Sequence, residues 1–408
     1  MTESGSLLKK HWNRMEDFFS SRKGKNIGIV IIVLSLGLAV YARLRGLQMV
    51  TDDLSSYLFG WYDNFAIGKG FATPVGTSFS NVSPPFLYLL FLASRFPSIP
   101  KVLAIKFFSI LFDGICVLAV YKIARIFQSK ITSWTAALAA ALAPTVWVNS
   151  AWWGQNDSIL TAFLLLSLYF LLKEKPFWGM VMFSLALSFK FQAVFFGPFL
   201  LLLFLVQKIP WKWVLLPPVI FVLLILPAAF GGQPFLSVLT VYFRQSDLFP
   251  VLTWNAPSFF AFFPDIRMAQ WEWIGFFLAG TGSLIYLWLG WKQRDQLTRE
   301  HMIELAMISL MVLPFLLPRM HERYFYAAAL FSIPLICARP RLLVIPFVLQ
   351  LTTLLSYFPY LYVKDLAPLW VLAAINLGVI VALIFYWQTQ NRAAKTPKLI
   401  GFDSKKAG

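Results

Sequence analysis

Short polar clusters interrupt an otherwise apolar chain, and they hold the residues whose chemistry stands out. The stretch TDDLSSYLFGWY, residues 51–62, places Asp52 beside Asp53 and follows them with aromatic residues. A carboxylate can act as a general base that takes a proton from a hydroxyl group. Because an ionised aspartate is costly inside a bilayer, the pair indicates either a functional site or a solvated loop. The residues alone leave both readings open.

A second cluster, WWGQND at residues 152–157, combines indole rings with amide and carboxylate groups. Indole faces stack on sugar rings while amides and carboxylates bind hydroxyl groups, so the cluster is typical of a sugar-binding surface. Adjacent tryptophans at the end of a membrane span are equally typical of an aromatic belt. The side chains that would orient a donor sugar or an acceptor are Trp153, Gln155, Asn156 and Asp157.

Basic residues form two further candidates. Lys190 is a lone cation in LALSFKFQAVFF, where it either snorkels to the surface or meets an anion. The stretch PRMHERYFY, residues 318–326, is denser in ionisable groups, with Arg319, His321, Glu322 and Arg323. If this stretch is helical, its two arginines lie on one face, and paired guanidinium groups suit a phosphate.

The remaining polar signals are weaker. Lys106 and Asp113 lie seven positions apart in one apolar run, and we interpret them as a structural pair on one helix face. The sequence has no His and Cys cluster with metal-ligand spacing, and no glycine loop typical of nucleotide binding. It therefore gives no sign of a metal site built on His and Cys residues, and it argues against a soluble nucleotide cofactor.

The elements that must position these clusters are membrane helices. Of the 408 residues, 59% are hydrophobic and only 13% are charged, and the mean hydropathy is +0.70. Soluble domains carry about 25% charged residues. Apolar runs long enough to cross a bilayer recur along the chain without strand-like alternation, which predicts an all-α polytopic membrane protein and excludes a β-barrel.

We predict twelve transmembrane helices with both termini in the cytoplasm. The run PPFLYLLFLASRF, 84–96, is too short to span and is expected to lie in the membrane plane on the outer side. Making it a span would move YKIARIFQSK and ARPR outside, against the positive-inside rule. The predicted spans are 27–46, 102–121, 131–150, 158–172, 176–190, 193–206, 213–230, 272–291, 302–317, 324–338, 341–357 and 368–388.

This topology defines the predicted domain organisation. Basic tails at 1–26 and 391–408 flank a single transmembrane domain, 27–390, whose longest external loops are 47–101 and 231–271. The formal net charge of +17 is then explained by basic cytoplasmic loops, so no nucleic-acid partner is expected. All the polar clusters fall on the external face. Compact loops and the absence of retention signals favour a bacterial plasma membrane over an endoplasmic reticulum membrane.

Taken together, the carboxylate loop after the first span, PPFLYLL, WWGQND and HERYF resemble the GT-C membrane glycosyltransferases. The closest likeness is to bacterial relatives of the GPI mannosyltransferases and of the glucosyltransferases that depend on dolichol-phosphate-glucose. The resemblance extends from about residue 28 to 390. It implies a GT-C-like fold and an enzyme that takes a mannose- or glucose-like hexose from a polyprenyl-phosphate donor and passes it to a glycan or lipid acceptor.

The resemblance also implies roles for individual residues. The family's essential acid in the first external loop maps onto Asp53 or Asp52, and Asp53 is the first choice because Tyr57 follows it by four positions. Adjacent aspartates differ from the Asp-x-Asp pattern of metal-dependent relatives, which leaves a divalent cation open as a cofactor.

The chemistry that fits these residues is an inverting transfer. A carboxylate takes the acceptor proton, and basic residues stabilise the leaving polyprenyl phosphate. The phosphate-binding candidates are Arg319, Arg323, Lys190 and His321. The candidates for binding sugar or acceptor are Trp153, Gln155, Asn156, Asp157, Glu322, Tyr57 and Trp61.

Two other functions compete with this interpretation. A transporter or flippase for a lipid-linked saccharide would also need basic and aromatic surfaces, but it would place polar groups near the midplane on broken helices. A membrane O-acyltransferase built around His321 is the third candidate, although a lone histidine at a helix end is more often structural.

Overall fold

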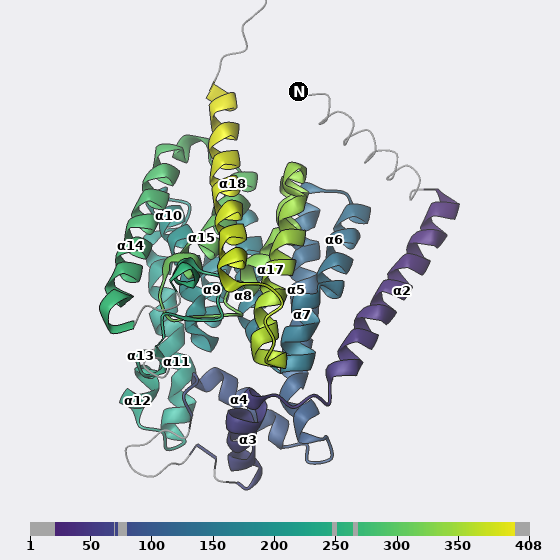
Figure 1. Ribbon diagram of the computed structural model, residues 1–408, viewed down its shortest axis with the longest axis vertical. Coiled ribbons are helices and arrows are strands. Elements are labelled where there is room, and N and C mark those ends of the chain that lie inside the picture. Colours follow the sequence, from purple (N-terminus) through teal and green to yellow (C-terminus); the bar gives the residue numbers. More distant parts are fainter. Residues whose placement is uncertain (1–20, 69, 72–79, 247–250, 264–267, 396–408) are drawn as a thin grey trace, which may run out of the picture.

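The computed structural model describes residues 21–68, 70–71, 80–246, 251–263 and 268–395, and almost all of its regular structure is helical (Figure 1). Residues 1–20 and 396–408, which make up most of the two predicted tails, lie outside the described residues. In Figure 1, α2 begins and α18 ends toward the upper end, whereas the short helices α3, α4 and α12 gather at the lower end.

Six helices in the described part of the chain are long and apolar enough to cross a membrane, or seven if one bent pair counts as a single span. The bent pair is α6 with the α7–η2 segment, which turns by 44°. The protein is therefore an integral membrane protein. The six helices include α2 (Arg22–Gly46), α5 (Lys101–Phe127), η4 (Trp211–Leu215) with α11 (Leu216–Phe230), α14 (Met268–Lys292), η7 (Pro340–Leu342) with α17 (Val344–Tyr362), and α18 (Leu369–Lys395).

Each of the twelve predicted spans falls on a helical segment, although the number of membrane crossings remains a prediction. The helical segments that are not among the six long apolar helices are shorter, and they contribute heavily to the main hydrophobic core. Such helices need no long apolar run because neighbouring helices cover them. They are α6 (Lys130–Leu142), α7 (Pro144–Trp147), η2 (Val148–Trp153), α8 (Asp157–Leu172), α9 (Pro176–Phe189), η3 (Phe191–Phe196), α10 (Gly197–Leu205), α15 (Arg299–Leu316) and α16 (Tyr326–Ala338).

A second, smaller hydrophobic core fixes the first long loop against the bundle. Asp52 starts a helix that continues through η1 (Leu54–Leu58) and α3 (Phe59–Ala66), and α4 (Pro84–Ser94) packs on α3. Leu54 and Leu87 are fully buried in this cluster beside residues of α5. The 11-residue length of α4 agrees with the prediction that this segment does not span the membrane.

Residues 317–325 are not helical, so the condition under which Arg319 and Arg323 would share a helix face is not met. Met320–His321 instead form a two-residue strand, β2, which pairs in parallel with β1 (Thr253–Trp254). Arg319 takes a positive φ of 62° as the chain enters β2. Pairing with β1, which is distant in sequence, therefore sets the local conformation. The two arginines of this segment do not share a helix face.

Candidate active site

Two π-helical turns carry the two motifs that the sequence singles out. Asp53 stands immediately before η1, and Gly154 ends η2 with φ of 86°. π-Helical turns are rare and occur often at functional sites. A Cβ on Gly154 would lie 2.5 Å from the Leu54 side chain, so the two turns approach too closely for any larger residue there.

Lys106 links the two turns through its side chain. Its side chain is fully buried, and its Nζ donates to four backbone carbonyls at 2.7 to 3.0 Å. Two of these carbonyls belong to Gly46 and Met49, where the chain leaves α2 just before the aspartates. The other two belong to Ala151 and Trp152, near the end of η2. An ammonium placed where helix carbonyls lack partners satisfies them and complements the helix dipoles.

The predicted pair of Lys106 with Asp113 does not form. Asp113 instead accepts hydrogen bonds from Arg43 at 2.9 and 3.1 Å and from the Ser150 hydroxyl at 2.6 Å. Arg43 comes from α2, so the bond anchors the first helix to α5. Both charged residues are structural, as expected, but each has its own partners.

Asp53 is held by three side chains from two segments, the end of η2 and α17. Its Oδ2 accepts hydrogen bonds from Trp153 Nε1 at 3.0 Å and from Gln155 Nε2, while its backbone N–H donates to the Tyr360 hydroxyl at 2.9 Å. Tyr360 also stacks on Trp153, with ring centroids 4.6 Å apart. These contacts fix the orientation of the carboxylate. Asp52, by contrast, is exposed and is not part of the cavity wall.

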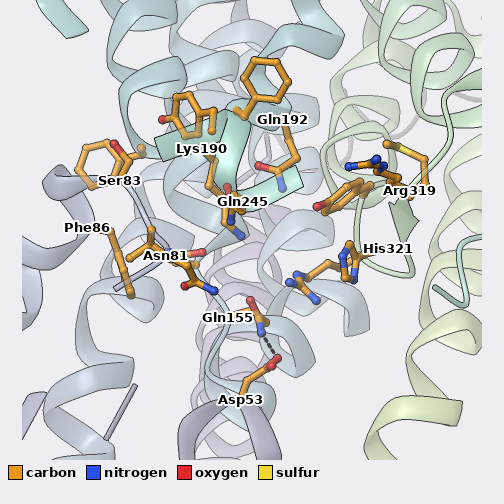
Figure 2. A pocket seen from close by; sticks show the side chains of 18 of the residues that line it. Asp53, Asn81, Ser83, Phe86, Gln155, Lys190, Gln192, Gln245, Arg319 and His321 are labelled. Carbon is orange, nitrogen blue, oxygen red and sulfur yellow. Dashed lines mark hydrogen bonds between the residues drawn. The ribbon is translucent and has the colours of Figure 1, made fainter. Parts of the chain in front are cut away.

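Asp53 borders a cavity of about 270 Å³. Figure 2 shows Asp53 and Gln155 at one side, Lys190 and Gln192 at the opposite side, and Arg319 with His321 at a third. Asp53 is the one carboxylate among the described residues of this wall. The other predicted site residues that line the cavity are Tyr57, Trp61, Gln155, Asn156, Lys190, Arg319, His321 and Arg323.

Lys190 reaches the cavity because the chain leaves helical geometry there. α9 ends at Phe189, and Lys190 adopts an extended conformation before η3 begins. Its Nζ lies 2.6 Å from Asp157 Oδ1. Asp157 is buried and also accepts a hydrogen bond from Asn149 at 2.9 Å. Asp157 is therefore the counter-ion of Lys190 and is not among the residues that line this cavity, while its sugar contact stays a prediction.

Arg323 is fixed in a similar way by two carboxylates and a ring. Its Nη1 lies 2.8 Å from Glu322 Oε1, its Nε lies 3.8 Å from Asp157 Oδ2, and its guanidinium lies 5.5 Å from the Trp153 ring centroid. Glu322 and Trp153 are fully buried outside the cavity wall. Both side chains contact Arg323, and Trp153 also binds Asp53, while their role in sugar binding stays a prediction.

Arg319 and His321 complete the basic side of the cavity. Arg319 Nε lies 2.7 Å from Glu272 on α14, which holds the side chain across the gap between β2 and that helix. Burial, aided by the charges of Arg323 and Lys190, lowers the pKa of His321 to about 2. The imidazole is thus neutral at physiological pH and can take part as a hydrogen-bonding group without adding charge.

Several lining residues carried no clear signal in the sequence. Polar groups from loops and helix ends contribute Asn81, Ser83, Gln192, Tyr242, Gln245 and Tyr324 to the wall. Gln192 and Gln245 fall in polar stretches next to residues that stand out in sequence, but nothing in the spacing identifies them individually. Tyr360 is more than 300 positions from Asp53 in the chain, and only folding brings the two together.

In the part of the chain that the structure describes, no group of three or more His, Cys, Asp or Glu side chains is arranged to hold a metal ion. The carboxylates around the cavity are committed to other partners. Asp157, Glu322 and Glu272 each lie within 3 Å of a basic nitrogen.

Comparison with known proteins supports the fold that the motifs indicate. Residues 83–231, a little over a third of the chain, match the family model described as dolichyl-phosphate-mannose-protein mannosyltransferase. The solved structure of ArnT from Cupriavidus metallidurans bound to undecaprenyl phosphate is similar, with a TM-score of 0.50 and 16% identity over 89% of this chain and 78% of that one. No curated protein sequence matches the chain. The predicted fold, a GT-C-like polytopic helical protein, is confirmed.

Proposed function

We propose that the protein is an inverting glycosyltransferase that moves a mannose- or glucose-like hexose from a polyprenyl-phosphate donor to an acceptor hydroxyl. The observation that carries the proposal is the division of the cavity wall. One oriented carboxylate, Asp53, stands at one side, Lys190 and Arg319 stand at other sides, and Arg323 is a third cation in the wall. A transfer from a sugar phosphate needs a base for the entering group and positive charge for the leaving group.

Asp53 is the general base in this proposal. Two N–H donors already bind its Oδ2, so we assign the acceptor proton to Oδ1. The acceptor oxygen attacks the anomeric carbon as it loses this proton, and the bond from that carbon to the phosphate oxygen breaks. The configuration at the anomeric carbon inverts because the two oxygens lie on opposite sides of it.

The basic side holds the phosphate, whose negative charge increases as the glycosidic bond breaks. Lys190 and Arg323 are anchored by buried carboxylates and so are preorganised, which makes their stabilisation of the transition state effective. Arg319 adds a third cation, and neutral His321 adds a hydrogen bond. The likeness to a structure bound to undecaprenyl phosphate and to the mannosyltransferase model supports a polyprenyl-phosphate donor.

We place this chemistry on the extracytoplasmic face. The loops at the opposite end of the bundle are the basic ones, which the positive-inside rule assigns to the cytoplasm. Sugar nucleotides are absent outside the cytoplasm, so a lipid-linked donor is the form of activated sugar that can reach this face.

The test uses purified full-length protein and polyprenyl-phosphate mannose or glucose with a short prenyl chain. We expect release or transfer of the hexose with inversion at the anomeric carbon. In proteoliposomes, a flippase would move the donor across the bilayer with its glycosidic bond intact. Flipping without any cleavage would overturn the proposal.

A further inference from the structure

A stripe of three side chains leads from the proposed base out of the cavity. Asp53, Tyr57 and Trp61 recur at intervals of four residues along η1 and α3, and all three line the cavity. Tyr57 is 45% exposed and Trp61 is half-buried, so neither ring is covered completely by the protein. Their centroids are 6.1 Å apart with the planes tilted by 43°. The two rings therefore do not stack on each other.

The geometry of an in-line displacement indicates whether the donor or the acceptor contacts this stripe. The leaving phosphate must lie at the side of Lys190 and Arg319, and the entering oxygen must reach the anomeric carbon from the opposite direction. That direction is the Asp53 side of the cavity, as Figure 2 shows for Asp53 against Lys190 and Arg319. The aromatic stripe consequently belongs to the acceptor.

The chemistry of the stripe indicates what kind of acceptor fits. Leu58, Val82 and Phe86 share a hydrophobic cluster with Trp61 and also line the cavity, and Asn81 adds an amide to the same wall. Aromatic faces pack against the C–H faces of pyranose rings, while amide and hydroxyl groups bind sugar hydroxyls. A peptide acceptor would instead require partners for its backbone N–H and C=O groups along the path.

We infer that the acceptor is an uncharged glycan of at least two pyranose units, with the reacting sugar against Tyr57 beside Asp53 and the next sugar against Trp61. This inference rests on the proposed function and adds the class of acceptor to it. The 6.1 Å between the ring centroids is about the length of one sugar residue with its linkage, so two rings serve two consecutive sugars.

The test measures acceptor use separately from donor cleavage. Purified full-length protein is given the short-chain polyprenyl-phosphate mannose with methyl hexopyranosides, their disaccharides, or a serine-containing hexapeptide, and hydrolysis of the donor by water is followed in parallel. We expect transfer to disaccharides with a lower KM than to monosaccharides, and no transfer to the peptide.

Variants of the stripe sharpen the result. Trp61→Ala should raise the KM for the disaccharide about tenfold and leave the monosaccharide KM unchanged, whereas Tyr57→Ala should raise both. Trp61→Phe and Tyr57→Phe keep a ring and should stay near wild type. Trp273→Ala serves as a control because Trp273 is exposed on α14 but does not line the cavity.

Each contrary outcome has a distinct meaning. Unchanged acceptor KM values in both alanine variants, or use of the peptide in preference to sugars, would overturn the inference while donor hydrolysis still supports the glycosyltransferase. Equal loss of hydrolysis and transfer in the variants would assign the rings to the donor or to folding, which also overturns it. Failure of wild-type protein to cleave any donor contradicts the proposed function itself.

Discussion

Lys106 and Lys190 both lie in apolar stretches of sequence, yet their surroundings differ. Lys106 Nζ is surrounded by four carbonyl oxygens, with no carboxylate partner and no access to the cavity. Lys190 Nζ has one carboxylate partner, Asp157, and lines the cavity. A cation whose donors are all used within the protein can only hold segments together. A cation anchored on one side and open on the other can bind an anion.

The same contrast separates the carboxylates. Asp113 is bound by Arg43 and Ser150 outside the cavity wall, whereas Asp53 is bound by N–H groups and faces the cavity. The carboxylate of Asp113 is held in an ion pair inside the protein and can only anchor helices. The carboxylate of Asp53 has no ion-pair partner among the described residues and can meet a substrate hydroxyl.

The largest expected effect comes from removing the structural cation. Lys106→Ala removes the ammonium from four carbonyls, of which Gly46 keeps the Met49 N–H as a donor, at a cost of roughly 1–3 kcal/mol for each that stays buried and unpaired. Thermal unfolding should show strong destabilisation, and activity should fall because η1 and η2 lose their common anchor. Lys101→Ala is the matched control, since Lys101 begins the same helix and pairs with the exposed Asp63.

Added cations test whether the ammonium alone accounts for this effect. The four Nζ–O distances of 2.7 to 3.0 Å suit ammonium or potassium, which carbonyl oxygens coordinate. Ammonium or potassium should restore part of the stability of Lys106→Ala, and lithium should not. Full activity of Lys106→Ala without any added cation would contradict the assignment.

A smaller and more selective effect is expected at the cavity. Lys190→Gln removes a charge-assisted contact to the donor phosphate, so the donor KM should rise about 10- to 100-fold while the fold is retained through Arg323 and Asn149 on Asp157. Competition by the product polyprenyl phosphate should weaken in parallel. An unchanged donor KM would show that Lys190 does not bind the donor phosphate. It would also contradict the functional difference between Lys190 and Lys106.

The counter-ion beneath Lys190 should matter through Lys190 itself. Asp157→Asn frees the ammonium to move, so we expect a donor KM about three- to tenfold higher. The double variant with Lys190→Gln should raise the donor KM by less than the product of the two single effects, because both changes disrupt the Lys190 contact and only the 3.8 Å contact to Arg323 is separate. Asp113→Asn is the comparison and should lower stability without altering the donor KM. Fully additive effects on the KM in the double variant would show that Asp157 does not act through Lys190.

The smallest effect is expected at His321. Because its pKa is lowered to about 2, the imidazole stays neutral between pH 6 and 8, and His321→Gln should not change the shape of the pH–rate profile there. Stability has a different pH dependence. Below pH 6.5 the unfolded chain binds a proton that the folded chain does not, so wild-type stability should fall with decreasing pH more than that of His321→Gln. A His321-dependent limb near pH 6.5 would contradict the neutral imidazole.

The sequence predicts the helices and the chemical groups well but not their partners. Hydropathy locates every helical segment that was predicted as a span, because apolar runs are local features. Asp53, Gln155, Lys190 and Arg323 also stand out locally, as polar residues in apolar surroundings, and the structure brings them to one cavity.

Partners could not be predicted because they join segments distant in the chain. The spacing of Lys106 and Asp113 gives no sign that Asp113 would bind Arg43, 70 positions away. Helical spacing in PRMHERYFY likewise fails because β1 pairs with the middle of this stretch. Whether a tryptophan contacts a sugar or supports a carboxylate depends on its burial, which for Trp153 is complete.

The most direct test of the proposed mechanism compares the two adjacent aspartates in single-turnover cleavage of a polyprenyl-phosphate sugar. Asp53→Asn keeps the size of the side chain but removes the base, so we expect a rate about 10²- to 10⁴-fold lower with unchanged donor binding. Asp52→Asn alters an exposed residue outside the cavity wall and should cleave at the wild-type rate. Wild-type cleavage by Asp53→Asn, or loss of cleavage in Asp52→Asn alone, would contradict the account.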